Sequence, residues 1–225
     1  MKLSFVIPTY NEAGNIGELI SRIKNVCKFP YEIIVVDDNS PDNTALIAKK
    51  AGAKVILRKD RKGLGSAYKE GFKHVNGDII FMMDADLSHD PADIPRFIKA
   101  LKGYDVVQGS RKIKGGGIEE WSPFRYAISY LSSLITLPLT GIKDPNGSYK
   151  CFKKEILNEI SLKNTSDGFG FLIEFMYLLR KHNKKIKEIP IKFNKRLSGK
   201  SKLTLKEILR SFRLYLSLYK RLLLK

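Results

Sequence analysis

The sequence predicts an α/β protein built on a mostly parallel, Rossmann-like sheet with helices on both faces. Short apolar stretches that are rich in β-branched residues alternate with stretches whose apolar residues recur at helical spacing. This alternation over the first half of the chain is typical of βαβ units. The 225 residues, 43% of them hydrophobic, are enough for a buried core in one large domain.

The expected strands of this sheet are short, and they occupy residues 2–7, 32–36, 54–57, 78–83 and 104–107. Helical spacing predicts the intervening helices at residues 16–27, 45–51, 67–75 and 94–101. Ser40 followed by Pro41 predicts the N-cap and first turn of the second helix. The second half is expected to contain a glycine-rich loop, two helices, an extended segment and a basic loop at residues 112–122, 123–137, 169–181, 186–193 and 194–202.

Cysteine usage and hydropathy indicate a reducing compartment and no membrane span. Cys27 and Cys151 are too few for a disulfide framework or a four-cysteine zinc site, so we expect free thiols. The N-terminus turns polar after seven residues, which is too short for a signal peptide. No apolar run approaches the ~18 residues that a membrane helix needs.

The net charge of +18 is concentrated at the end of the chain, where residues 180–225 carry 16 basic and two acidic side chains. Such a tail indicates an anionic partner: membrane headgroups, a phosphate ligand or nucleic acid. Residues 204–224 predict a basic helix with an apolar stripe, formed by Leu205, Ile208, Leu209, Phe212, Tyr215, Tyr219 and Leu222. This helix either packs on the domain with a solvated basic face or lies on an anionic bilayer.

Carboxylates collect where the expected strands end: Glu12, Asp37, Asp38, Asp84 and Asp86. Solvated helix caps would account for some of them, but so many on one sheet edge favour a bound cation, since clustered carboxylates repel each other. Asp84 and Asp86 are two residues apart and point to the same side of a strand end. Oxygen ligands without nearby cysteine favour Mg²⁺ or Mn²⁺. His89 is expected to be a local hydrogen-bonding residue, with metal ligation as the alternative.

Together these residues resemble family 2 glycosyltransferases of the GT-A fold, and among them the dolichol-phosphate (polyprenyl-phosphate) mannose synthases. Seven strings in order carry the resemblance over almost 200 residues: PTYNE at 8–12, VVDDNSPDNT at 35–44, GLGSAYKEGF at 63–72, MDADLSHDP at 83–91, GSR at 109–111, DPNGSYK at 144–150 and IPIKFNKRLSGKSK at 189–202. The QxxRW motif of processive polysaccharide synthases is absent, and Trp121 follows Glu120 instead.

The resemblance implies a role for each matching residue. The base and ribose of a nucleotide sugar would be held by Pro8, Tyr10, Glu12, Val36 and Asp38. The sugar nucleotide would also contact Asp84, Ala85 and Asp86, and Asp86 would bind the metal through the diphosphate. Ser88 stands where some family members use glutamine as a second metal ligand, and serine is a weaker ligand. The donor diphosphate and acceptor phosphate would meet Arg111, Arg125, Arg196 and Lys202.

The expected function is metal-dependent, inverting transfer of mannose from GDP-mannose to dolichyl or polyprenyl phosphate. Residues 1–202 would form the catalytic domain and residues 203–225 the C-terminal helix, peripheral on the cytoplasmic face of a membrane, with a small membrane subunit as an alternative means of attachment. A polyprenyl-phosphate glucosyltransferase, or another enzyme using a UDP-sugar, is the alternative within the class. Two other classes remain as alternatives: a nucleic-acid-binding protein that uses the basic tail, and a non-catalytic scaffold. Neither of them explains the carboxylates at the strand ends.

Overall fold

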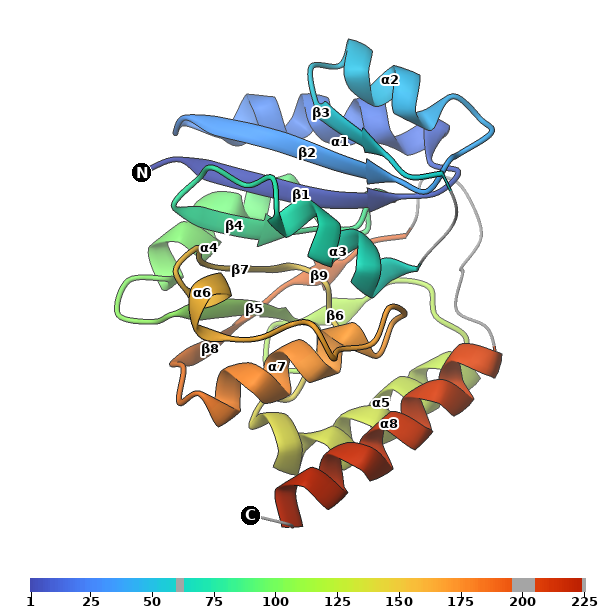
Figure 1. Ribbon diagram of the computed structural model, residues 1–225, viewed down its shortest axis with the longest axis vertical. Helices are drawn as coiled ribbons and strands as arrows, with labels where there is room; N and C mark the ends of the chain where they lie inside the picture. Colours follow the sequence, from blue (N-terminus) through green and yellow to red (C-terminus); the bar gives the residue numbers. More distant parts are fainter. Residues whose placement is uncertain (60–62, 196–204, 224–225) are drawn as a thin grey trace.

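The computed structural model describes residues 1–59, 63–195 and 205–223, without the side chains of residues 205–208. Within these residues, seven strands form one sheet in the order β3-β2-β1-β4-β7-β5-β8 (Figure 1). Its strands are β1 (Leu3–Thr9), β2 (Tyr31–Asp37), β3 (Lys54–Leu57), β4 (Ile79–Met82), β5 (Val106–Ser110), β7 (Lys150–Lys153) and β8 (Ile186–Pro190). The short strands β6 (Gly117–Ile118) and β9 (Lys192–Phe193) pair with each other beside it.

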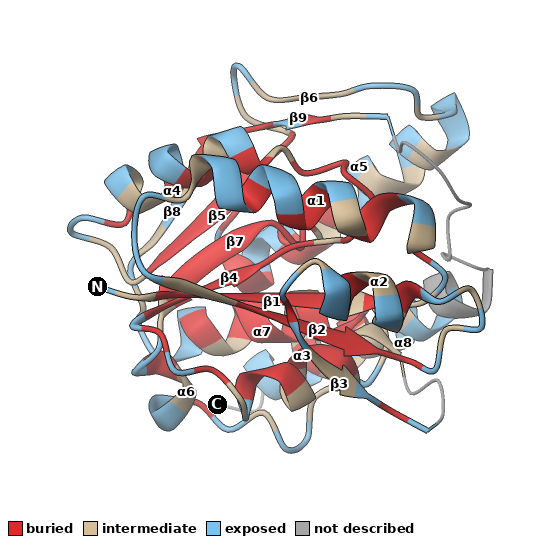
Figure 2. Cartoon of the chain, turned by 90° about the horizontal axis from the view of Figure 1, so that it is seen from above, coloured by how far each residue is buried: buried red, intermediate tan, exposed pale blue. Residues whose placement is uncertain are grey.

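Helices cover both faces of the sheet, as the sequence predicts (Figure 2). Their bounds are α1 (Ala13–Val26), α2 (Thr44–Lys50), α3 (Leu64–Phe72), α4 (Ile94–Ala100), α5 (Pro123–Thr140), α6 (Ile156–Glu159), α7 (Phe171–Lys181) and α8 (Leu205–Leu223), with a 3₁₀ turn at Pro91–Asp93 before α4. Side chains alternate along each strand, so Phe81 belongs to a core that includes residues of α1, α2 and α4, while Ile80 belongs to a second core that includes residues of α3, α6 and α7. The α/β fold with a mostly parallel sheet is therefore confirmed.

One strand of the main sheet, β7, was not predicted from the sequence, and it changes the topology of that sheet. β7 runs antiparallel between β4 and β5, whereas β1 with β2 and β4, β2 with β3, and β5 with β8 are parallel pairs. It has four residues and lies outside the regular alternation of the first half, so periodicity alone does not reveal it. Because β7 runs the other way, the loop before it enters the sheet at the edge where the parallel strands end.

The helix start predicted at Ser40 and Pro41 is wrong, because α2 begins at Thr44. The Ser40 hydroxyl donates to the Asp37 carboxylate instead, and it accepts from the backbone N–H of Asn11. The turn before α2 is closed by Asp42, whose carboxylate accepts from the Thr44 N–H at 3.1 Å. The fifth strand is also shifted, to Val106–Ser110, and the expected glycine-rich loop contains β6.

The C-terminal helix packs on the domain, which is the first of the two alternatives that the sequence left open, and it also leaves apolar side chains exposed. In α8, Tyr215 and Leu218 are buried against α5 and α7, so the helix packs on the domain. Leu209, Leu216 and Leu223 of the same helix remain 61–81% exposed. The helices α5 and α8 lie side by side at the end of the molecule away from β3 (Figure 1).

Gly71 in α3 packs directly on the sheet, and Gly71→Ala should destabilise the protein by about 1–3 kcal/mol. An added Cβ would lie 2.3 Å from Val6 Cγ1, a stiff and fully buried side chain. Gly17→Ala in α1 is the matched control, because its Cβ would meet only Ile47 Cγ2 at 3.4 Å. That change should stabilise by up to about 1 kcal/mol through helix propensity. Urea unfolding measures both, and equal effects would contradict the prediction.

Candidate active site

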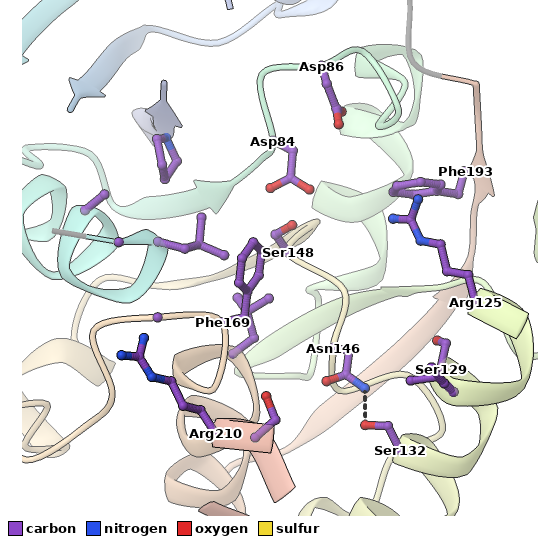
Figure 3. A pocket seen from close by; sticks show the side chains of 18 of the residues that line it. Asp84, Asp86, Arg125, Ser129, Ser132, Asn146, Ser148, Phe169, Phe193 and Arg210 are labelled. Carbon is purple, nitrogen blue, oxygen red and sulfur yellow. Dashed lines mark hydrogen bonds between the residues drawn. The ribbon is translucent and has the colours of Figure 1, made fainter. Parts of the chain in front are cut away.

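A pocket of about 950 Å³ opens at the sheet edge where β1, β2, β4 and β5 end. It brings together nine of the residues that the sequence singled out, from positions spread over more than 100 residues (Figure 3): Pro8, Tyr10, Glu12, Asp38, Asp84, Ala85, Asp86, Arg111 and Arg125. The pocket continues from this polar region to an apolar region between α5 and α8, lined by Phe124, Ile128, Leu131, Phe212 and Tyr215.

Two predicted site residues do not line the pocket, and two more lie outside the described residues. The Val36 side chain is fully buried in the core on the α3 face of the sheet, so only its backbone could meet a ligand. Ser88 is also fully buried, and its hydroxyl donates to Asp86 Oδ1 at 2.5 Å. Its contact therefore orients Asp86. Arg196 and Lys202 lie outside the described residues.

Asp37 is a structural residue, which corrects the expectation that all five rim carboxylates surround a cation. Its carboxylate is fully buried and accepts hydrogen bonds from the Thr9 hydroxyl at 2.7 Å and from the Ser40 N–H at 2.8 Å. These bonds tie the loops after β1 and β2 to each other. Asp37 does not line the pocket, because its carboxylate oxygens accept these hydrogen bonds.

Arg58 is a pocket-supporting residue that sequence reasoning missed. It is 8% exposed, and its Nε donates to Asp38 Oδ1 at 2.5 Å. The same guanidinium donates to the Ser66 hydroxyl at 2.7 Å and to the Gly63 carbonyl. Asp38 is thus held against the start of α3 with its charge balanced. An arginine directly after a predicted strand was the available signal, but nothing in the sequence pairs it with Asp38.

Arg111 is held rigidly by Asp144, which is fully buried. The guanidinium donates through Nε and Nη2 to the two carboxylate oxygens, each at 2.7 Å, and the Arg111 N–H adds a third bond at 2.9 Å. Burial alone would lower the pKa of Arg111, but the Asp144 charge outweighs burial and raises it. The same pairing lowers the pKa of Asp144 against the effect of burial, so both groups are charged at neutral pH.

The Asp84–Ala85–Asp86 segment is fixed by its own loop. His89 Nδ1 accepts from the Asp84 N–H at 3.2 Å, and its Nε2 lies 3.9 Å from Asp84 Oδ2. Burial lowers the pKa of His89, so a neutral ring orients Asp84. Leu87 adopts φ 62°, the left-handed conformation that costs a non-glycine residue about 1–2 kcal/mol. The fold maintains this strained turn beside the two carboxylates.

The donor set suits a hard divalent cation that shares its ligands with another molecule. Asp84 and Asp86 line the pocket with oxygen donors, and the Asp84 side chain is 29% exposed. Among the described residues, no group of three or more His, Cys, Asp or Glu side chains could hold a metal alone. A cation at these carboxylates would therefore complete its coordination with water and a bound diphosphate, as Mg²⁺ characteristically does.

Lys150 is a fully buried lysine on β7. Its Nζ has no hydrogen-bond partner among the described residues. Burial lowers its pKa from 10.5 to about 7, although the charges of Asp144 and Asp84 oppose this shift. Sequence reasoning did not identify it, because a lysine in a short strand gives no sign of its burial.

Lys150→Met should raise the free energy of unfolding by roughly 1–4 kcal/mol near neutral pH, because it removes an amine that must lose its proton, or keep its charge without water, when the chain folds. Between pH 7 and 10.5 the unfolded state binds the lysine proton more tightly than the folded state does. The wild type therefore loses stability as pH falls from 10.5 to 7, and the increase in the free energy of unfolding that Lys150→Met gives should become larger. Urea unfolding across the range measures it. Lys153→Met, at a side chain 41% exposed on the same strand, is the control, and a pH-independent gain at Lys150 would contradict the prediction.

The fold and the carboxylate-lined pocket define a glycosyltransferase of the GT-A type. The chain belongs to glycosyl transferase family 2, whose model matches residues 4–161. It is 42% identical over 218 residues to a dolichol-phosphate mannosyltransferase of Pyrococcus furiosus, covering 92% of this chain but 61% of that relative. The chain thus spans less than two thirds of that protein. It is 33% identical to an undecaprenyl-phosphate mannosyltransferase of Micrococcus luteus, covering 91% of this chain and 88% of the relative.

Solved structures support the fold. Mannosyl-3-phosphoglycerate synthase from Rubrobacter xylanophilus has a TM-score of 0.74 at 21% identity, covering 99% of this chain and 74% of its own. Glucosyl-3-phosphoglycerate synthase from Mycobacterium tuberculosis, solved with Mn²⁺, UDP and glucosyl-3-phosphoglycerate, has a TM-score of 0.74 at 20% identity, covering 97% and 78%. Within the described residues, no helix is both long and apolar enough to cross a bilayer.

Proposed function

We propose that the protein transfers mannose from GDP-mannose to a dolichyl or polyprenyl phosphate, with Mg²⁺ or Mn²⁺, and inverts the anomeric carbon. The observation that supports this most is the single pocket that joins a carboxylate-lined region, two arginines and an apolar region between α5 and α8. These regions match in order a nucleotide diphosphate with its cation, a phosphate, and a lipid chain. The names of the relatives from P. furiosus and M. luteus agree with mannose as the transferred sugar and a lipid phosphate as the acceptor.

In this proposal the donor occupies the region at the ends of β1, β2 and β4. Tyr10, Glu12 and Asp38 line the part of the pocket that would take the base and ribose, with Pro8 beside them. Asp84 and Asp86 would hold the cation that bridges to the diphosphate. When bound, this cation would neutralise charge on the departing diphosphate. The Ser88 hydroxyl holds the Asp86 carboxylate and His89 holds the Asp84 backbone N–H, which supports a fixed position for both residues.

The acceptor phosphate would meet Arg111 and Arg125, and also Arg196 and Lys202, which lie outside the described residues. A phosphate monoester is largely dianionic at neutral pH, so it needs no strong general base. Arginine forks suit such a group and would steer it toward the sugar. An acceptor oxygen forms the new bond to the anomeric carbon while the bond to the diphosphate breaks. The electron pair leaves with GDP, and the configuration inverts.

Asp86→Asn should lower kcat/KM for mannose transfer by about 100-fold or more, because it removes a charge that would hold the cation. The assay offers GDP-mannose and UDP-glucose in parallel to the purified protein with Mn²⁺ or Mg²⁺ and a short polyprenyl phosphate. Asp78→Asn is the control, since Asp78 immediately precedes β4 at the opposite end of the strand and contacts the Lys2 N–H.

Three outcomes of this assay would change the proposal. Product from UDP-glucose alone would replace the sugar. Equal activity of wild type and Asp86→Asn would remove the metal assignment. No transfer by the purified chain would point to a missing small membrane subunit or another acceptor, whereas transfer by the chain alone makes such a subunit unnecessary.

We also propose that α5 and α8 rest on the cytoplasmic face of an anionic membrane. Exposed apolar side chains gather on these two helices: Phe124, Tyr126, Tyr130, Leu131, Leu134, Leu209, Phe212, Leu216 and Leu223. Exposed basic residues of α8 accompany them: Arg210, Arg213, Lys220 and Arg221. Apolar contact and cationic attraction together are what a peripheral helix needs. The apolar region of the pocket opens between these helices, where a membrane-embedded lipid would enter.

The double variant L209E/L216E should reduce binding to phosphatidylglycerol-containing vesicles at least about tenfold, because two exposed leucines would no longer enter the bilayer. Both side chains are more than 60% exposed, so the fold should tolerate the change. L46E/L57E places the same charges on leucines that are 50% and 61% exposed on α2 and β3, at the other end of the molecule. Vesicle sedimentation compares them, and equal losses for the two variants would refute a specific membrane surface.

A further inference from the structure

The single tryptophan of the chain lies against two arginines in the pocket. The Arg125 guanidinium carbon is 4.2 Å from the centroid of the Trp121 ring, and the Arg111 guanidinium carbon is 5.1 Å from it. Both distances are within the ~6 Å at which a cation is attracted to an aromatic face. The proposed function gives roles to the arginines but none to this ring.

The contacts continue from this ring to the carboxylate loop. Phe193 lies 5.2 Å from the Arg111 guanidinium and meets Trp121 edge-on at 5.7 Å. On its other side Phe193 meets the His89 ring at 5.6 Å, and His89 holds Asp84. A connected series of rings and guanidinium groups therefore runs from the proposed cation site to Arg125. Figure 3 shows the Arg125 side chain directed from α5 toward Phe193.

The two arginines are held by different means, and the difference bears on binding. Arg111 is fixed by the Asp144 carboxylate, which balances its charge. An indole face attracts a cation through its quadrupole and has no net charge, so Trp121 holds the Arg125 guanidinium without adding an opposing charge of its own. Two guanidinium groups at one ring also repel each other, and the ring offsets part of that repulsion. Two guanidinium groups at one ring are suited to a doubly charged phosphate.

We propose that Trp121 is a positioning residue that holds the Arg125 guanidinium beside Arg111, so that the two together bind the acceptor's phosphate monoester. This inference rests on the proposed function. Arg125 is in the first turn of α5, and the pocket-lining residues Phe124 and Ile128 of the same helix begin the apolar region. The phosphate would therefore be held where the polar and apolar regions of the pocket meet.

Kinetics of four proteins test the role of the ring, with farnesyl phosphate as acceptor. Trp121→Leu should raise the acceptor KM about tenfold, the loss expected from one partly desolvated cation–π contact. Its GDP-mannose KM, and its kcat at saturating acceptor, should stay within about twofold of wild type. Trp121→Phe keeps an aromatic face and should recover most of the loss. Tyr104→Leu removes another ring that carries a cation, Lys187 at 5.1 Å, far from the pocket, and should change neither KM.

Unchanged acceptor KM in Trp121→Leu would overturn the proposal. So would equal impairment of the Phe and Leu variants, since the ring would then matter only as packing. A parallel rise in both KM values with a lower melting temperature would also overturn it, because that pattern indicates a structural role.

A binding measurement decides the proposal without turnover. Trp121 is the sole tryptophan, so tryptophan fluorescence reports directly on the surroundings of the Arg111 and Arg125 side chains. Farnesyl phosphate should change its emission in the wild type, whereas farnesol, which lacks the phosphate, should not. Arg125→Gln should weaken the apparent affinity for farnesyl phosphate about tenfold or more. An equal response to farnesol, or an unaltered affinity in Arg125→Gln, would overturn the inference. Absence of mannose transfer alone would count against the proposed function and leave this test intact.

Discussion

Repulsion between carboxylates at one edge of the sheet is the constraint on which the site depends. Parallel strands bring their polar ends together, so acidic side chains distant in sequence become neighbours. Three of them have separate partners: Asp37 has Thr9 and Ser40, Asp38 has Arg58, and Asp86 has Ser88. Arg58 balances the charge of Asp38, whereas Asp84 and Asp86 line the pocket, where the proposed cation and diphosphate would balance their charges.

The antiparallel strand β7 is short, but it determines which residue lies under Arg111 in the site. It carries the 144–149 loop to the same edge as the ends of the parallel strands, and so brings Asp144 under Arg111. The rigid Arg111 then contacts Trp121 and Phe193, which extend the ordered part of the site toward α5. Catalytic geometry of this precision requires side chains whose own positions are already determined by buried contacts.

The helices α5 and α8 differ from the helices around the sheet in how much of their apolar surface they bury. The helices on the two faces of the sheet bury their apolar sides in two separate cores. By contrast, α5 and α8 bury only part of theirs, against each other and α7, and leave leucines and aromatic rings exposed. Exposed apolar area of this extent marks an interaction surface. Its position at the apolar region of the pocket agrees with the lipid acceptor that we propose.

The sequence by itself determined the α/β alternation, the mostly parallel sheet and the segments whose polar residues meet at one edge, because these follow from local periodicity and from the direction of parallel strands. It also identified nine of the residues that line the pocket, from Pro8 to Arg125, through short motifs. Only the tertiary structure decided that Asp37 is structural, that Arg58 supports Asp38, that Lys150 is buried and that Trp121 faces two arginines. Asp38 and Arg58 are 20 positions apart, and the burial of Lys150 depends on a short strand, so neither leaves a periodic signal in the sequence. Trp121 is only four residues before Arg125, but the two side chains come into contact because of the way in which α5 begins.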